Sequence, residues 1–169
     1  MVDASGSDVS RRGQHRVSFE AAIRDLRPQD LPELTWAGTR SHLASVASIL
    51  DRIAAGENLE YLAVCGPTDR PLGVGCLDLT RRPDAGEIGQ LAVHPAMQSC
   101  GLGTLLIRAA EQRILDRGLD RAELAVESRR ARELYERLGY RAYGTETVSW
   151  PVDDGMYTTE VTLMRRQLP

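Results

Sequence analysis

The sequence predicts an α/β domain of the α+β kind, in which helices cover both faces of one mixed sheet. Two observations indicate this fold. Segments with the alternating pattern of strands and segments with the period of amphipathic helices interleave along the chain. Several neighbouring strands have no crossover helix between them, so the sheet is expected to be mixed rather than purely parallel. The length of 169 residues suits one domain with its own core.

The first half of the chain predicts a strand, two helices and a hairpin. A strand is expected at residues 19–24, and a short helix follows a proline break, around residues 31–36. Gly56 ends a longer amphipathic helix. Strands at 59–65 and 72–79 flank a Gly-Pro turn and form the hairpin. The apolar residues that recur at helical spacing in the longer helix are Leu43, Val46, Ala47, Leu50, Ile53 and Ala54.

The second half alternates strands with helices and closes with two strands. A central strand at 87–93 leads through a glycine-containing loop into a helix at 102–117, which Gly118 ends. The remaining elements are expected in the order strand 121–126, helix 129–138, strand 140–150, loop 151–157 and strand 160–166.

Composition and charge exclude several classes of protein. The formal net charge is −3 and the pI is about 5.7, so no basic excess is present to bind nucleic acid or an anionic membrane. No apolar run is long enough to span a membrane, and the first residues do not form a signal peptide. Residues 1–16 are polar and aperiodic, so we expect a disordered tail there and a single domain over residues 17–169.

Three cysteines are unevenly spaced at positions 65, 76 and 100. An odd number of scattered cysteines is explained if they serve as small apolar side chains in a reducing cytoplasm, so a cytoplasmic location is expected. There is no Cys-x-x-Cys pair and no cluster of histidines, so no metal is expected. Cys100 lies in the glycine-containing loop, where it would serve first as a backbone position and second as a reactive thiol.

The loop between the central strand and the next helix predicts a phosphate site. The strand meets a His94-Pro95 turn, and residues 98–103 then open directly into the helix. Glycines let backbone N–H groups approach a ligand, and a helix N-terminus favours negative charge. The loop is not a P-loop, because no lysine follows Gly103, and it lacks the third glycine of a dinucleotide fingerprint. The alternative to a phosphate site is an ordinary loop at the start of a helix, in which the glycines are present only for close packing.

A second segment, VESRRARELYERLGYRAYG at 126–144, strengthens the first. Together the two resemble the GNAT superfamily of N-acetyltransferases, whose members carry Gln/Arg-x-x-Gly-x-Gly/Ala before a long helix and Asn-x-x-Ala-x-x-Leu-Tyr-Glu-x-Leu-Gly-Phe/Tyr after the next strand. The resemblance covers about residues 17–168 and departs at Ser128, where asparagine is usual. The matching residues are Gln98, Gly101, Gly103, Ala131, Leu134, Tyr135, Glu136, Leu138, Gly139 and Tyr140.

The resemblance implies acetyl-CoA as a cosubstrate and a GNAT-type, mostly antiparallel sheet whose fourth and fifth strands splay apart to admit it. Backbone groups of the central strand would bind the pantetheine arm, and the N–H groups of the loop would hold the pyrophosphate. Ser128 can donate one hydrogen bond to the cofactor or cap the following helix. The residues expected to bind acetyl-CoA are Leu91, Ala92, Val93, Gln98, Ser99, Cys100, Gly101, Leu102, Gly103, Thr104 and Ser128.

Acetyl transfer to an amine needs an acceptor for the ammonium proton and a donor for the departing thiolate. The resembled family places a tyrosine beside the CoA sulfur at the position of Tyr135, so Tyr135 is the expected general acid. Alternatively, its ring serves only to pack the apolar face of the helix against the core. Glu87, four residues before Leu91, is the expected base, and Glu127 is its rival. Either glutamate could instead be a solvated strand-end residue. Glu123 ranks below both because it lies in the middle of a strand and faces the side opposite to Leu124 and Val126.

We therefore expect an N-acetyltransferase that moves an acetyl group from acetyl-CoA to a primary amine of a small molecule or peptide by direct attack. The alternative is a CoA-binding regulatory or interaction module with little turnover. Neither nucleic acid nor membrane is an expected partner, and a homodimer is a possible assembly. The residues that could face the amine, unless they are plain surface, are Trp36, His42, Trp150, Asp153, Asp154 and Tyr157.

Overall fold

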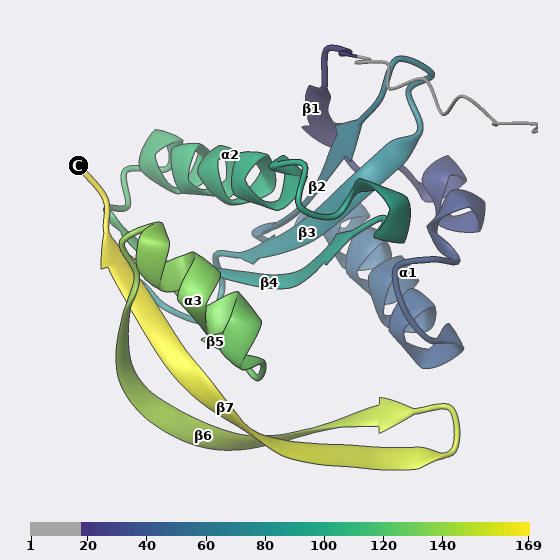
Figure 1. The fold of residues 1–169 in the computed structure, drawn as a ribbon. Coiled ribbons are helices and arrows are strands. Elements are labelled where there is room, and N and C mark those ends of the chain that lie inside the picture. The colour runs from purple at the N-terminus through teal and green to yellow at the C-terminus, as the bar shows by residue number, and fades with distance from the viewer. Residues whose placement is uncertain (1–17) are drawn as a thin grey trace, which may run out of the picture.

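The computed structural model describes residues 18–169, so the tail expected at residues 1–16 lies outside the described part. One seven-stranded sheet forms the centre of the molecule (Figure 1). Its strands are β1 (Ala22–Asp25), β2 (Leu59–Cys65), β3 (Pro71–Asp78), β4 (Gly86–Val93), β5 (Arg121–Val126), β6 (Arg141–Val152) and β7 (Gly155–Gln167). The helices are α1 (Arg40–Ala54), α2 (Leu102–Asp116), α3 (Arg129–Arg137) and the 3-10 helices η1 (Pro28–Leu34) and η2 (Pro95–Met97).

The sheet is mixed and mostly antiparallel, as expected. Its strand order is β1-β2-β3-β4-β5-β7-β6. All neighbours pair antiparallel except β4 and β5, which α2 connects as a crossover. The last strand in sequence therefore lies between β5 and β6, and β6 forms an edge of the sheet.

Helices cover both faces of the sheet and bury two hydrophobic cores (Figure 1). The larger core lies between the sheet and helices α2 and α3. Every second residue of β5 points into it, namely Ala122, Leu124 and Val126. The smaller core lies under α1, which buries Val46 and Leu50 against the opposite face. Because side chains alternate along a strand, the other residues of β5 point to the face that α1 covers. The candidate site described below has one part on each of these two faces.

The structure corrects the expected loop at residues 151–157. Pairing of β6 with β7 continues without a break to Val152 and Gly155, so only Asp153 and Asp154 form the turn of a long hairpin. Pro151 does not end β6, because β6 is an edge strand and the proline needs no donor on its open side. Among the described residues, no helix is long and apolar enough to cross a membrane.

Candidate active site

A β-bulge in β4 shapes the centre of the candidate site. Gln90 and Leu91 together stand opposite Gly75 of β3, whereas pairing is one to one on either side. Gln90 has φ 50°, an uncommon backbone conformation for a residue with a side chain. Its amide group is held at both ends: the Tyr61 hydroxyl donates to Oε1 over 3.0 Å, and Nε2 donates to Ser45 Oγ over 3.3 Å.

The fourth and fifth strands separate beside this bulge. Parallel pairing joins Gly86–Ile88 to Ala122–Leu124 and stops there, although β4 runs on to Val93 and β5 to Val126. Beyond the bulge, the backbone N–H and C=O groups of β4 that point toward β5 are therefore not hydrogen-bonded by that strand. Such groups need a partner, and a ligand inserted between the strands can supply one.

The glycine-containing loop ends at the N-terminus of α2. Ser99 and Gly101 both have positive φ, 63° and 87°, and Gly101 is the N-cap of the helix. The first N–H groups of a helix have no partner within it, so those at the start of α2 are available to an anion. Gly103 lies in the first turn, and a Cβ there would meet nothing nearer than Val93 Cγ2 at 3.7 Å. Gly101 is therefore needed for its left-handed backbone conformation. Gly103 instead leaves space beside the first turn of α2, because it has no side chain.

The two sequence motifs meet at the start of α3. Ser128 caps this helix, because its Oγ accepts a hydrogen bond from the Ala131 N–H over 3.1 Å. The hydroxyl hydrogen of Ser128 is still free to be donated to a ligand. Arg130 reaches the phosphate loop and donates from Nη2 to Ser99 Oγ over 3.2 Å. A guanidinium group therefore stands beside the expected pyrophosphate loop, an arrangement that sequence reasoning missed.

Tyr135 combines core packing with a free hydroxyl. It packs against the same core as Leu91 and Val93, and its ring lies edge-on to Tyr140 with 5.9 Å between centroids. The Tyr140 hydroxyl donates to Glu111 over 3.0 Å, whereas the Tyr135 hydroxyl has no hydrogen-bond partner in residues 18–169. Burial raises the pKa of Tyr135, so the phenol stays protonated at neutral pH, as a proton donor must.

A cleft of about 1000 Å³ opens on the other side of the splayed strands, between β4, β5 and the β6–β7 hairpin. We call it the acceptor cleft. Both candidate bases, Glu87 and Glu127, line it, and so do Gln90 of the bulge and Trp150 of the hairpin. The sheet thus places the phosphate loop and Tyr135 on its α2 side and the carboxylates in the acceptor cleft.

Two of the carboxylates in the acceptor cleft are paired with arginines. Glu87 Oε1 accepts a hydrogen bond from Arg81 over 2.8 Å. Glu123, its neighbour on β5, is buried, lies 3.4 Å from Arg82 and accepts a hydrogen bond from the Tyr143 hydroxyl over 3.1 Å. Glu123 ranked low from the sequence partly because it alternates with the apolar residues of β5, and that same alternation turns it toward this cleft.

Glu127 stands apart from these pairs. It follows the end of β5, and its Oε1 accepts hydrogen bonds from the Thr159 hydroxyl over 3.0 Å and from the Tyr157 hydroxyl. The bond to Glu127 raises the pKa of Tyr157, because a nearby carboxylate disfavours the phenolate. Glu127 therefore meets hydroxyl groups at the open end of the strands, whereas Glu87 meets a cation at the paired end.

A family model described as the acetyltransferase (GNAT) family matches residues 21–140. Among solved structures, the chain is similar to a spermidine N-acetyltransferase SpeG chimera of Vibrio cholerae and hSSAT, with 16% identity over 87% of this chain and 95% of that one and a TM-score of 0.69. A search of the curated proteins found no match.

Two further structures share the fold. The ribosomal-protein-S18-alanine N-acetyltransferase of Escherichia coli has 22% identity over 88% of this chain and 94% of that one, with a TM-score of 0.68. A GNAT superfamily phosphinothricin acetyltransferase of Sinorhizobium meliloti, solved in complex with AcCoA, has 18% identity over 88% of each chain and the same TM-score. At these identities the likeness concerns the fold, while the matched family model covers most of the chain.

Proposed function

Because the chain belongs to the acetyltransferase (GNAT) family, we propose that it transfers an acetyl group from acetyl-CoA to a primary amine of a small molecule or peptide. The separation of β4 from β5 is the observation that carries the proposal. It leaves free backbone groups on β4 between a helix N-terminus suited to phosphate and a cleft that contains carboxylates. A cofactor and an acceptor can thus meet from opposite sides of the sheet.

On the cofactor side, the N–H groups of residues 99–104 would hold the pyrophosphate, and Arg130 would add a charged hydrogen bond to a phosphate oxygen. The pantetheine arm would lie along β4 beyond the bulge, where Leu91, Ala92 and Val93 supply strand-type hydrogen bonds. Gln98, exposed at the start of the loop, would frame the phosphate site. The arm would then direct the thioester toward the acceptor cleft.

On the acceptor side, the neutral amine would attack the thioester carbon directly. The amine loses one proton, the carbonyl oxygen gains and then releases negative charge, and the C–S bond breaks to free CoA. A backbone N–H near Leu91 would stabilise the oxygen, and Tyr135 would give its proton to the sulfur. Tyr135 would then recover a proton from solvent.

We assign the proton from the amine first to Glu127 and second to Glu87. Attack beside Leu91 takes place at the open end of the splayed strands, where Glu127 stands. Glu87 lies within the paired part, where Arg81 donates a hydrogen bond to its Oε1. Because it is set back within the paired strands, Glu87 would act through a water molecule.

A thiol-release assay tests the proposal directly. The full chain is mixed with acetyl-CoA and a panel of alkylamines, polyamines, aminoglycosides and peptides, and free CoA thiol is followed together with the mass of each amine. We expect at least one amine to gain 42 Da, the mass of an added acetyl group, at the rate of thiol release. The proposal fails if acetyl-CoA binds by calorimetry while every amine is left unmodified, an outcome that would favour the regulatory alternative.

The location follows the same reasoning. Cys65, Cys76 and Cys100 are all free thiols, and two of them are buried. Unpaired cysteines and a metabolite cosubstrate both suit a reducing compartment, so we propose that the reaction takes place in the cytoplasm.

A further inference from the structure

The β6–β7 hairpin extends beyond the helices that cover the rest of the sheet. Between Thr145 and Thr158, nearly every residue of its two strands is exposed to solvent. In Figure 1 the hairpin curves away from β5, passes below β4 and α3, and ends beside the lower end of α1. A projecting hairpin of this length needs an anchor if it is to keep one position.

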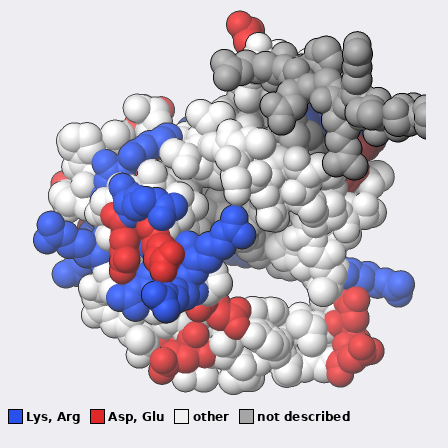
Figure 2. Space-filling model, in the orientation of Figure 1, with Lys and Arg blue, Asp and Glu red and all other residues white. Residues whose placement is uncertain are grey.

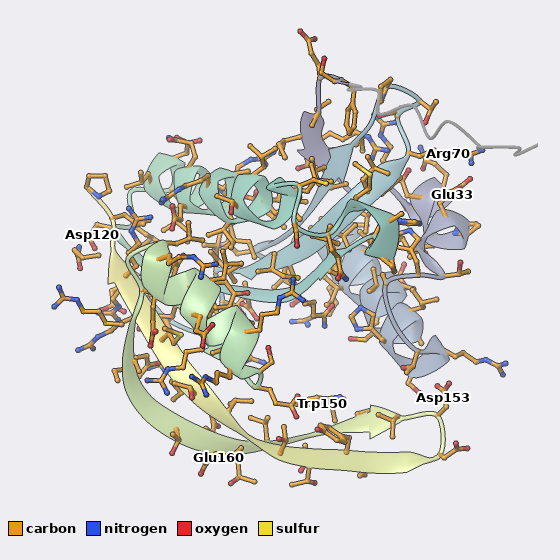
Figure 3. The ribbon with its side chains drawn as sticks, viewed as in Figure 1. Glu33, Arg70, Asp120, Trp150, Asp153 and Glu160 are labelled. Atoms are coloured by element: carbon orange, nitrogen blue, oxygen red, sulfur yellow. The ribbon has the colours of Figure 1, made fainter. Side chains whose placement is uncertain are left out.

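The anchor is a contact between the hairpin tip and the N-terminus of α1. Asp153 Oδ1 accepts a hydrogen bond from the Ser41 backbone N–H over 3.0 Å and another from Ser41 Oγ over 2.9 Å. Figure 3 places Asp153 against the end of α1. The two residues are 112 positions apart in the sequence, and a carboxylate is well placed at a helix N-terminus because of the helix dipole. The bond to the Ser41 N–H lowers the pKa of Asp153, so the carboxylate stays ionised.

This contact closes the acceptor cleft into an arch. The arch runs from β5 along the hairpin to Asp153, across to Ser41, and back through α1 to the bulge, where Gln90 hydrogen-bonds Ser45 of the same helix. Figure 2 shows the opening that this arrangement leaves between the hairpin and the rest of the molecule. An acceptor that enters between the hairpin and α1 therefore passes through an opening that is bounded on every side by protein.

The inner wall of the arch suits a cationic chain. Trp150 and Tyr157 are cross-strand partners whose ring centroids are 5.2 Å apart, and each is about 40% exposed. Glu127 and Glu146 line the same cleft as Trp150. The two arginines that also line it, Arg81 and Arg82, are paired with Glu87 and Glu123, so carboxylates outnumber guanidinium groups there. Aromatic faces together with carboxylates attract an ammonium group, and an opening closed on all sides limits the size of the group that can pass through it.

We propose that the contact between Ser41 and Asp153 makes this site selective for primary amines carried at the end of slender, unbranched cationic chains. With the contact formed, a bulky amine such as an aminoglycoside cannot bring its nitrogen past the hairpin. With the contact broken, the hairpin swings away and the cleft accepts both kinds of amine. The proposal rests on the proposed acetyltransferase function, but the contact itself can be tested without any turnover.

The first test is hydrogen exchange on the full chain, comparing Asp153→Ala with Asp154→Ala as the matched control. Asp154 occupies the same turn, is not among the residues that line the acceptor cleft, and has no side-chain hydrogen bond to residues 18–169, so the structure leaves it as plain surface. We expect amides at 146–160 to exchange about threefold faster in Asp153→Ala than in the parent, and at the parental rate in Asp154→Ala, because only the first change releases the tip. Equal exchange in all three proteins would overturn the proposal, whether or not any amine is acetylated.

The second test measures selectivity as the ratio of kcat/KM for a linear polyamine to kcat/KM for an aminoglycoside. We expect Asp153→Ala to lower this ratio about threefold or more, mainly through a lower KM for the bulky amine, and Asp154→Ala to leave it unchanged. Ser41→Ala should give an intermediate ratio because the backbone N–H still donates to Asp153. A ratio that does not move in Asp153→Ala, despite faster exchange, would show that the arch does not select the acceptor.

Discussion

Leu91 occupies the space that a side chain at Gly75 would fill. A Cβ at position 75 would lie 2.5 Å from Leu91 Cδ2, closer than two carbon atoms can approach without displacement. Gly75 is also the single residue of β3 that faces the two bulged residues of β4. The absence of a side chain on one strand therefore permits the bulge on the next, and the bulge is where β4 leaves β5.

Gly75→Ala should disturb this arrangement and destabilise the protein by about 1–3 kcal/mol, the usual range for overpacking a buried position. The Leu91 side chain would have to move, next to the backbone expected to bind pantetheine. Urea unfolding gives the change in stability, and calorimetry with CoA gives the change in affinity. Gly89→Ala is the control, because a Cβ there meets nothing within 4 Å. Equal behaviour of the two variants would contradict the role of Gly75.

Gly103→Ala tests the phosphate loop without disturbing the fold. The added Cβ would lie 3.7 Å from Val93 Cγ2, an ordinary contact, so stability should be unchanged or slightly higher because alanine favours helices. CoA should nevertheless bind about tenfold more weakly, since the methyl group stands where a phosphate must approach the helix N-terminus. Calorimetry with CoA and with pantetheine separates the effects: only CoA should lose affinity. Unchanged CoA affinity would remove the loop from the cofactor site.

Tyr135→Phe should keep the fold and the CoA affinity, because the ring still packs against Tyr140 and only the free hydroxyl is lost. The kcat with a good amine should fall about 100-fold, the lower range for loss of a general acid. A thioester analogue with a better leaving thiol should recover part of the rate, since a more acidic thiol can leave as the thiolate without being protonated by Tyr135. A variant that turns over like the parent would leave Tyr135 as a core residue only.

Glu127→Gln and Glu87→Gln separate the two candidate bases. Glutamine keeps the size and hydrogen bonding of glutamate but cannot accept the proton of the ammonium. The variant that lacks the base should lose about 100-fold in rate at neutral pH and recover part of it at high pH, where free amine is abundant. We expect this profile for Glu127→Gln and only a small, pH-independent loss for Glu87→Gln. The reverse result would move the role to Glu87.

Asp30 should make stability depend on pH. Burial raises the pKa of its carboxyl group, but hydrogen bonds from Arg24 and from the Arg27 N–H outweigh burial, so the net pKa lies below its ordinary value. A lowered folded pKa means that the stabilisation is present above the unfolded pKa of about 4 and is lost as pH falls through the folded pKa. Asp30→Asn should cost about 2 kcal/mol at pH 7 and progressively less as the pH falls below about 4, as measured by urea unfolding across this range. A cost that stays constant with pH would contradict this assignment.

The sequence alone predicted the α/β architecture, helices on both faces and most of the elements. Local patterns decide these features, because helical spacing and strand alternation depend on which face each residue buries. Strands 59–65 and 121–126 match β2 and β5 at both ends. The family followed from two short motifs in order, Gln98 to Gly103 and Ala131 to Tyr140, and the family model covers both.

Only the tertiary structure decided how the strands are ordered and what surrounds each carboxylate. The place of β7 between β5 and β6, the bulge at Gln90 and the arch closed by Ser41 and Asp153 all depend on partners far away in the chain. Glu87 and Glu127 read alike in the sequence, yet one meets Arg81 and the other two hydroxyl groups. Local sequence determines which residues can face the site, while long-range pairing of backbone and charge determines what each of them meets there.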